Sequence, residues 1–120
     1  MSSSVIAHCK TIDKMSIMDA AERLKIAVSE NANRITFGSW ATFECKGNQV
    51  DIKLPDFKAN DKALSQKRVK KLVQLGTYIY TKAKLKKAGL NCTTDIADAV
   101  LAVNANQPLN LEFEEEIVSS

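Results

Sequence analysis

The segment from Asp61 to Ala88 constrains the fold more than any other part of the sequence. Placed at 100° per residue, its apolar side chains fall in one arc of about 160°, the width of a helix stripe that faces a core. The arc continues through Gly76, so the pattern predicts one long helix. Its members are Val69, Leu72, Val73, Leu75, Gly76, Ile79, Tyr80 and Ala83.

A competing interpretation divides this segment in two. It ends a helix at Gly76 and makes residues 77–81 a strand, because Thr, Tyr and Ile all favour β structure. The unbroken apolar arc favours the continuous helix instead. Gly89 is the expected residue just past its end, and the lysines of the last turn suit the negative end of the helix dipole.

Strand patterns precede this helix. The β-branched run at residues 5–9 predicts a first strand, and residues 34–45 are rich in Ile, Thr, Phe and Trp but interrupted at Gly38. Residues 49–54 then alternate between apolar and polar side chains, as in a half-buried strand. The turn residues at 46–48 join the last two runs into a predicted hairpin.

Two shorter helices are predicted from capping residues and periodicity. Ser16 is a plausible N-cap for a helix with apolar side chains three and four apart, which residues 31–33 would end. Thr93 or Thr94 is the expected cap of a helix over residues 95–104, whose acids at the start suit the dipole.

Residues 109–114 alternate again and predict a half-buried strand with a charged side, which suits the edge of a sheet. At 120 residues and 45% hydrophobic, the chain has the size and composition of one domain with its own core. We expect residues 1–120 to form a single α+β domain. A small, mainly antiparallel sheet, built from the hairpin plus terminal strands, is covered by two or three helices on one face.

Charge along the chain is sorted by sign. Residues 62–87 contain nine basic residues and no acidic one, whereas residues 88–120 contain six acidic residues and no basic one. The net charge of +3 hides this separation. A solvated helix normally interleaves the two signs, while a concentrated positive field attracts polyanions.

The predicted binding surface is the polar side of the long helix. Lysine ammonium groups neutralise phosphates and release counterions, and an exposed tyrosine can stack on an unpaired base. Because lysine outnumbers arginine here, we expect weak sequence preference. The candidate residues are Lys67, Arg68, Lys70, Lys71, Gln74, Tyr78 and Lys82.

These residues predict a non-enzymatic, nucleic-acid-associated accessory or regulatory protein that binds the phosphate backbone of DNA or RNA. The alternative is a small inhibitor or adaptor that docks on an acidic protein surface by charge complementarity. A third interpretation is a solvated face without a partner. The acidic surface of Glu112, Glu114 and Glu116 can cover the basic helix, contact a basic partner, or meet the helix of a second subunit in a homodimer. The sequence leaves these alternatives open.

The sequence carries no catalytic or metal-binding signature. Neighbouring strand positions point to opposite faces, which separates His8 from Cys9, and the cysteines at 9, 45 and 92 form no close pairs. The four glycines are isolated, so no phosphate-binding loop is expected. We therefore predict no enzyme activity, no metal and no cofactor, and a packing role for Trp40.

An odd number of scattered cysteines is typical of a reducing compartment, so we expect a cytoplasmic protein, or a nuclear one if its host cell has a nucleus. The apolar run at residues 5–7 is too short for a signal peptide or a membrane span. We expect no membrane association.

Overall fold

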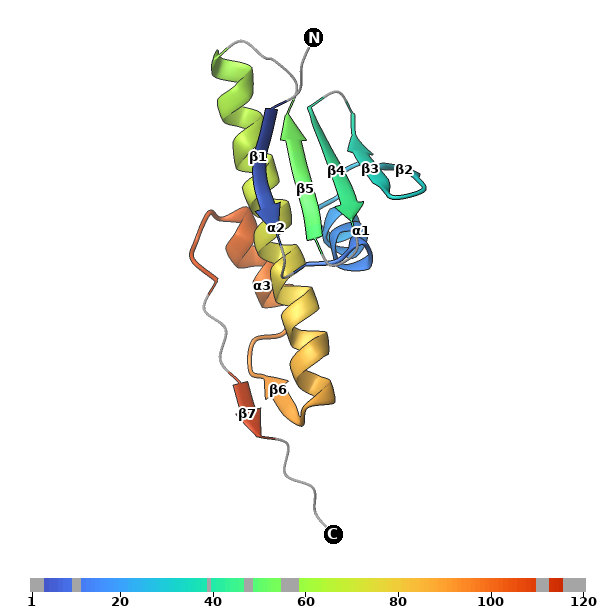
Figure 1. Ribbon diagram of the computed structural model, residues 1–120. Helices are drawn as coiled ribbons and strands as arrows, with labels where there is room; N and C mark the ends of the chain where they lie inside the picture. Colours follow the sequence, from blue (N-terminus) through green and yellow to red (C-terminus); the bar gives the residue numbers. More distant parts are fainter. Residues whose placement is uncertain are drawn as a thin grey trace.

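Figure 1 shows an antiparallel sheet with the helices packed behind one of its faces. This computed structural model describes the backbone of residues 4–9, 12–38, 40–46, 49–54, 59–109 and 113–115, and the side chains of these ranges except 4–9, 59–62 and 115. The helices are α1 (Lys14–Arg23), α2 (Ala59–Lys87) and α3 (Ile96–Asn104). The strands are β1 (Ser4–Cys9), β2 (Ser29–Asn31), β3 (Arg34–Phe37), β4 (Ala41–Lys46), β5 (Gln49–Leu54), β6 (Leu90–Cys92) and β7 (Phe113–Glu115).

The main sheet has the strand order β1-β5-β4-β3-β2, with every neighbouring pair antiparallel. The predicted hairpin is β4–β5, in which Phe43 lies opposite Ile52. The run at residues 34–45 forms two strands that separate at Gly38, where φ is +55° and glycine is favoured. The α+β class and the mainly antiparallel sheet covered by helices are confirmed.

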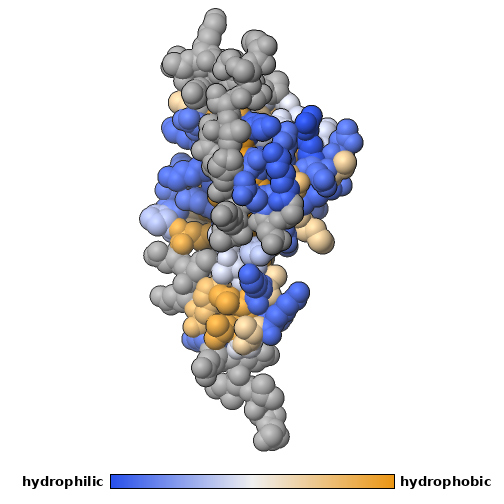
Figure 2. Space-filling view, in the orientation of Figure 1, coloured by the Kyte–Doolittle hydropathy of each residue, from blue (hydrophilic) through white to orange (hydrophobic). Residues whose placement is uncertain are grey.

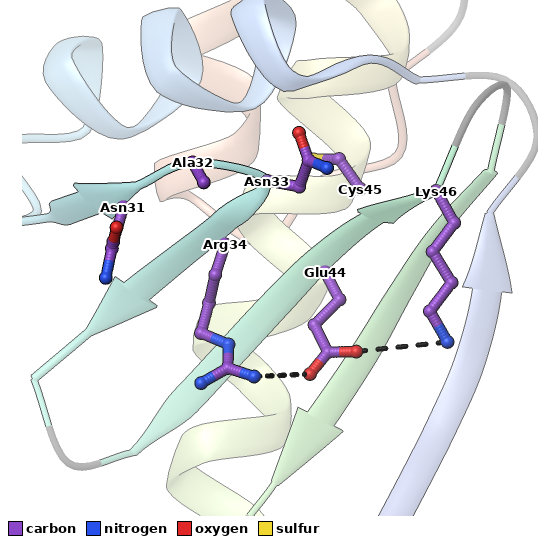
Figure 3. Close-up of a pocket in the computed structure, with 7 residues that line it drawn as sticks. All are labelled: Asn31, Ala32, Asn33, Arg34, Glu44, Cys45 and Lys46. Carbon is purple, nitrogen blue, oxygen red and sulfur yellow. Dashed lines mark hydrogen bonds and ion pairs between the residues drawn. The ribbon is translucent and has the colours of Figure 1, made fainter.

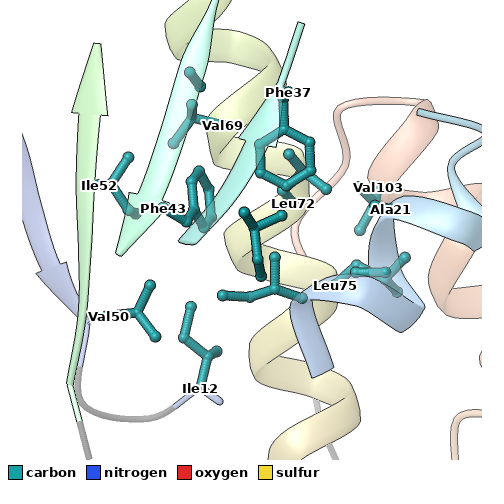
Figure 4. Close-up of a cluster of buried hydrophobic side chains, with 14 of the residues drawn as sticks. Ile12, Ala21, Phe37, Phe43, Val50, Ile52, Val69, Leu72, Leu75 and Val103 are labelled. Atoms are coloured by element: carbon teal, nitrogen blue, oxygen red, sulfur yellow. The ribbon is translucent and has the colours of Figure 1, made fainter. Parts of the chain in front are cut away.

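The core lies between the sheet and α2 (Figure 4). Alternate side chains of β3, β4 and β5 point to the helices, and Phe37 and Phe43 meet edge to face at 4.9 Å. Burying one such side chain contributes about 1.5–3 kcal/mol. The fully buried residues at this interface include Ile35, Phe37, Phe43, Ile52, Leu72 and Leu75.

Helix α2 runs unbroken through Gly76, so the continuous-helix prediction is confirmed and residues 77–81 are not a strand. The helix ends as predicted, with Gly89 following it at φ +85°. Its N-terminal half packs behind the sheet, and its C-terminal half extends beyond it (Figure 1).

Helix α1 differs from its prediction at both ends. Asp13 is the N-cap rather than Ser16, because the Asp13 carboxylate accepts the Ser16 backbone N–H at 2.8 Å. The helix stops at Arg23 instead of continuing to residues 31–33, and strand β2 already occupies residues 29–31. Its end is a Schellman motif in which the Ile26 N–H donates to the Ala21 carbonyl. Lys25 occupies the left-handed position at φ 59°, where sequence rules expect glycine.

The C-terminal strand does not join the main sheet. Strand β7 pairs instead with β6, which was not predicted, and this small ladder lies beside the C-terminal end of α2 (Figure 1). Helix α3 is capped by Asp95 rather than Thr93 or Thr94, since the Asp95 carboxylate accepts the Asp98 N–H at 2.9 Å. Within the described ranges, no helix combines the length and apolar character needed to cross a bilayer.

Candidate anion-binding site

Four of the seven predicted binding residues line one hollow on α2. Lys67, Lys70, Lys71 and Gln74 are spaced i, i+3, i+4 and i+7, which places them on one side of a helix. With Asn106, which follows α3, they enclose a hollow of about 340 Å³. We call this site the lysine hollow. Three lysines and two amide residues therefore border one small volume.

Asn106 is a functional candidate that the sequence reasoning missed. It sits in the left-handed position at φ 57°, and its N–H donates to the Val103 carbonyl while the Gln107 N–H donates to the Ala102 carbonyl. This Schellman motif ends α3 and fixes Asn106 beside α2. An asparagine just past an apolar helix pattern is the sequence signal for such a position. The partial negative charge at the C-terminal end of α3 attracts the nearby lysine ammonium groups, but it is too small to neutralise their charge.

None of the described residues that line the hollow is acidic. Among the described side chains, the ion pairs lie on α1 and the main sheet, and none involves Lys67, Lys70 or Lys71. Glu114 is exposed on β7 opposite Asn91, at the C-terminal end of α2. That end is about 24 Å along the helix axis from Lys71. The other two predicted acidic residues, Glu112 and Glu116, lie outside the described residues.

Arg68 lies apart from the hollow. Its guanidinium carbon is 5.3 Å from the centre of the Trp40 ring, which in turn stacks on Phe37 at 5.4 Å. This cation–π contact holds the exposed Arg68 against the connection between β3 and β4. Trp40 thus has the predicted packing role.

Tyr78 was predicted on the exposed side of α2, and the structure corrects this. Its side chain is 1% exposed, and its hydroxyl donates to the Thr94 carbonyl. Burial, as the main cause, raises the pKa of Tyr78 to about 12. The amphipathic pattern accounted for one packed side of α2, whereas β6 and α3 pack on a second side. Tyr78 is therefore unable to stack on a base, and Lys82 lies 5.6 Å from its ring centre rather than in the hollow.

A second charged surface covers the outer face of the sheet, which Figure 2 shows as a hydrophilic area. Glu44 binds Arg34 and Lys53 at 3.1 Å each, and Figure 3 shows Arg34 and Lys46 paired with it. Lys46 also pairs with Asp51 at 3.2 Å. The hydrogen bond from Lys53, as the largest cause, holds the pKa of Glu44 below its ordinary 4.5. On this face the acidic and basic side chains neutralise one another.

Of the residues considered for catalysis, the structure describes the side chains of Cys45 and Cys92, and both are half-buried. Burial raises the pKa of the Cys45 thiol, which is opposite to the shift that activates a nucleophile. By strand register, His8 lies opposite Asp51 and Cys9 opposite Val50. In the part of the chain that the structure describes, no three His, Cys, Asp or Glu residues are grouped closely enough to hold a metal ion.

Comparison with known proteins gives no match. No family fits the chain, and no curated sequence or solved structure is significantly similar to it.

Proposed function

We propose that this protein is a non-enzymatic, nucleic-acid-associated accessory protein that binds the phosphate backbone through the lysine hollow. The observation that supports this most directly is the convergence of Lys67, Lys70 and Lys71 on one hollow, where none of the described carboxylates neutralises them. Like charges so close together repel one another, and a bound polyanion relieves that repulsion.

The composition of the hollow indicates how the ligand is held. Ammonium groups act as point charges for phosphates, while the amides of Gln74 and Asn106 can hydrogen-bond to sugar, phosphate or base oxygens. Because the hollow contains no guanidinium, bidentate reading of guanine is not expected. Binding is therefore expected to be tolerant of sequence.

Neutralisation of three phosphates by the three lysines predicts how strongly binding depends on salt concentration. The logarithm of the association constant should fall with the logarithm of salt concentration at a slope of about −2.7 on duplex DNA, or about −2.1 on a single strand. Between about 50 and 200 mM salt, the affinity for duplex should fall about 40-fold.

The test compares two matched double variants by fluorescence anisotropy with labelled DNA and RNA of about 16 nucleotides. Lys67→Glu/Lys70→Glu and Lys84→Glu/Lys87→Glu each reverse two exposed lysines three positions apart on α2. Their net charges are identical, so any difference reports the hollow. We expect the first pair to lower affinity at least about tenfold and the second to lower it much less.

Equal losses in both variants would show attraction by net charge alone and would refute the proposed site. If no nucleic acid binds even at low salt, the same hollow is better assigned to an acidic protein surface, the alternative that its charge also fits.

A further inference from the structure

Helix α3 is apolar on more sides than its packing explains. Ala99 and Val103 are fully buried against the core, yet Leu101 is 67% exposed and Ala97 is also exposed. A surface helix normally carries polar side chains opposite its core stripe. The outer side of α3 departs from that rule, so a large apolar side chain stands in water.

This apolar surface borders a groove between α3 and α1. The groove encloses about 690 Å³, and α3 lines it with Ile96, Ala97, Val100 and Leu101. An adjoining hollow of about 290 Å³ shares Ile96 and extends to α2. We call the first of these the α1–α3 groove.

The rim of the groove on the α1 side carries both signs of charge. Asp19 and Arg23 pair with each other at 2.9 Å. Glu22 and Lys25 also line the groove and are exposed, and neither forms an ion pair with another described side chain. One unpaired acid and one unpaired base therefore stand close together on the same rim.

This arrangement fits a second copy of the chain better than a partner of one charge sign. A twofold axis places the same patch on both sides of an interface, so Glu22 of each copy can face Lys25 of the other. A uniformly acidic or basic partner would match one of these charges and repel the other.

We propose that the α1–α3 groove is the twofold interface of a homodimer. Leu101 of each copy packs on the apolar side of the other copy's groove, and Glu22 pairs with Lys25 across the axis. This inference does not rest on the proposed nucleic-acid binding. Because the contacts from each copy are one exposed leucine and one exposed ion pair, we expect weak association, with a dissociation constant on the order of 10–100 µM.

The first test measures molar mass by sedimentation from about 5 to 500 µM protein, a range that brackets this dissociation constant. The wild-type protein should change from monomer to dimer, and Leu101→Lys should remain monomeric. Leu64→Lys is the matched control, since Leu64 is a 51% exposed leucine on α2 outside the groove, and it should dimerise like the wild type. Circular dichroism checks that both variants are folded.

The second test is specific to the twofold geometry. Glu22→Lys and Lys25→Glu should each weaken dimerisation at least about tenfold, because like charges then face each other across the axis. Mixed in equal amounts, these two variants should form a heterodimer with both ion pairs restored. The double variant Glu22→Lys/Lys25→Glu should recover wild-type association.

A wild-type chain that stays monomeric over the whole range would overturn the proposal and leave a different protein as the occupant of the groove. Equal effects of Leu101→Lys and Leu64→Lys would also overturn it. A mixture that fails to associate better than its components would refute the twofold pairing.

Discussion

The outer face of the sheet and the lysine hollow are both rich in charge, but they differ in how that charge is balanced. On the sheet, Glu44 contacts three cations, of which Arg34 and Lys53 come from the two neighbouring strands and Lys46 from its own strand. In the hollow, Lys67, Lys70 and Lys71 share one helix with no acid between them. On the sheet, acidic and basic side chains of the protein itself balance one another. Like charges gathered on one side of a helix are balanced best by a ligand of the opposite charge.

We expect the largest effect on binding when an acidic side chain is placed in the hollow. Gln74→Glu keeps the size of the side chain and puts a carboxylate four residues after Lys70 and three after Lys71. We expect affinity for nucleic acid to fall about tenfold and the salt slope to lose about one unit.

The matched control for this change is Asn91→Asp on β6, which alters net charge equally at an exposed position near the far end of α2. It should leave affinity within about twofold of the wild type. Unchanged binding by Gln74→Glu would contradict the role of the hollow.

The reverse change removes the central acid from the sheet. Glu44→Gln leaves Arg34, Lys46 and Lys53 close together without their shared carboxylate, so stability measured by urea unfolding at pH 7 should fall. Glu114→Gln, at an exposed strand position, is the control and should have little effect.

The pH dependence of this effect follows from the lowered pKa of Glu44. A carboxylate with a depressed folded-state pKa stabilises the protein above its ordinary 4.5 and loses that contribution as pH falls through the folded-state value. The difference between wild type and Glu44→Gln should therefore close in acid. A gap that persists at low pH would point to lost packing instead of lost charge.

Tyr78→Phe tests whether a residue of the same helix contributes to stability without contributing to binding. Loss of the hydroxyl bond to the Thr94 carbonyl should cost about 1 kcal/mol of unfolding free energy and leave nucleic-acid affinity unchanged. Tyr80→Phe, which is half-buried, should cost less. Lost affinity in Tyr78→Phe alone would restore a binding role to this residue.

The raised pKa of Tyr78 gives a second measurement of the same burial. Its phenol should ionise near pH 12 in an ultraviolet titration, and stability should begin to fall above about pH 10, where the unfolded chain ionises first.

The smallest effect is expected for Arg68→Ala. It removes an exposed cation–π contact with Trp40, so the unfolding free energy should fall by about 0.5–1 kcal/mol. Because Arg68 lies outside the hollow, affinity should fall less than with Lys70→Ala. The opposite order would move the centre of the binding surface toward the sheet.

Much of the fold was predictable because its signals are local and periodic. Burial can be read directly from the apolar arc along α2 and from the alternation in β5. Backbone geometry can be read from the glycine that follows α2. The predicted end of α1 was wrong because Lys25 adopts a left-handed conformation that its residue type disfavours. The β6–β7 ladder was missed because three-residue strands carry too little pattern to detect.

The candidate site was predictable only in part, for a physical reason. Helical spacing brought Lys67, Lys70, Lys71 and Gln74 together as expected. Contacts between distant segments decided the rest, since the end of α3 adds Asn106 and the chain around Thr94 buries Tyr78. The apolar periodicity of a sequence identifies one packed side of a helix, whereas α2 is packed on two sides.

The stack of Arg68 on Trp40 supplies a natural optical probe. Trp40 is the only tryptophan in the chain, so all of its indole emission comes from a ring that contacts the residue next to Lys67. A ligand that displaces Arg68 from this ring changes the surroundings of the indole, so the fluorescence of Trp40 reports such a ligand without any attached dye.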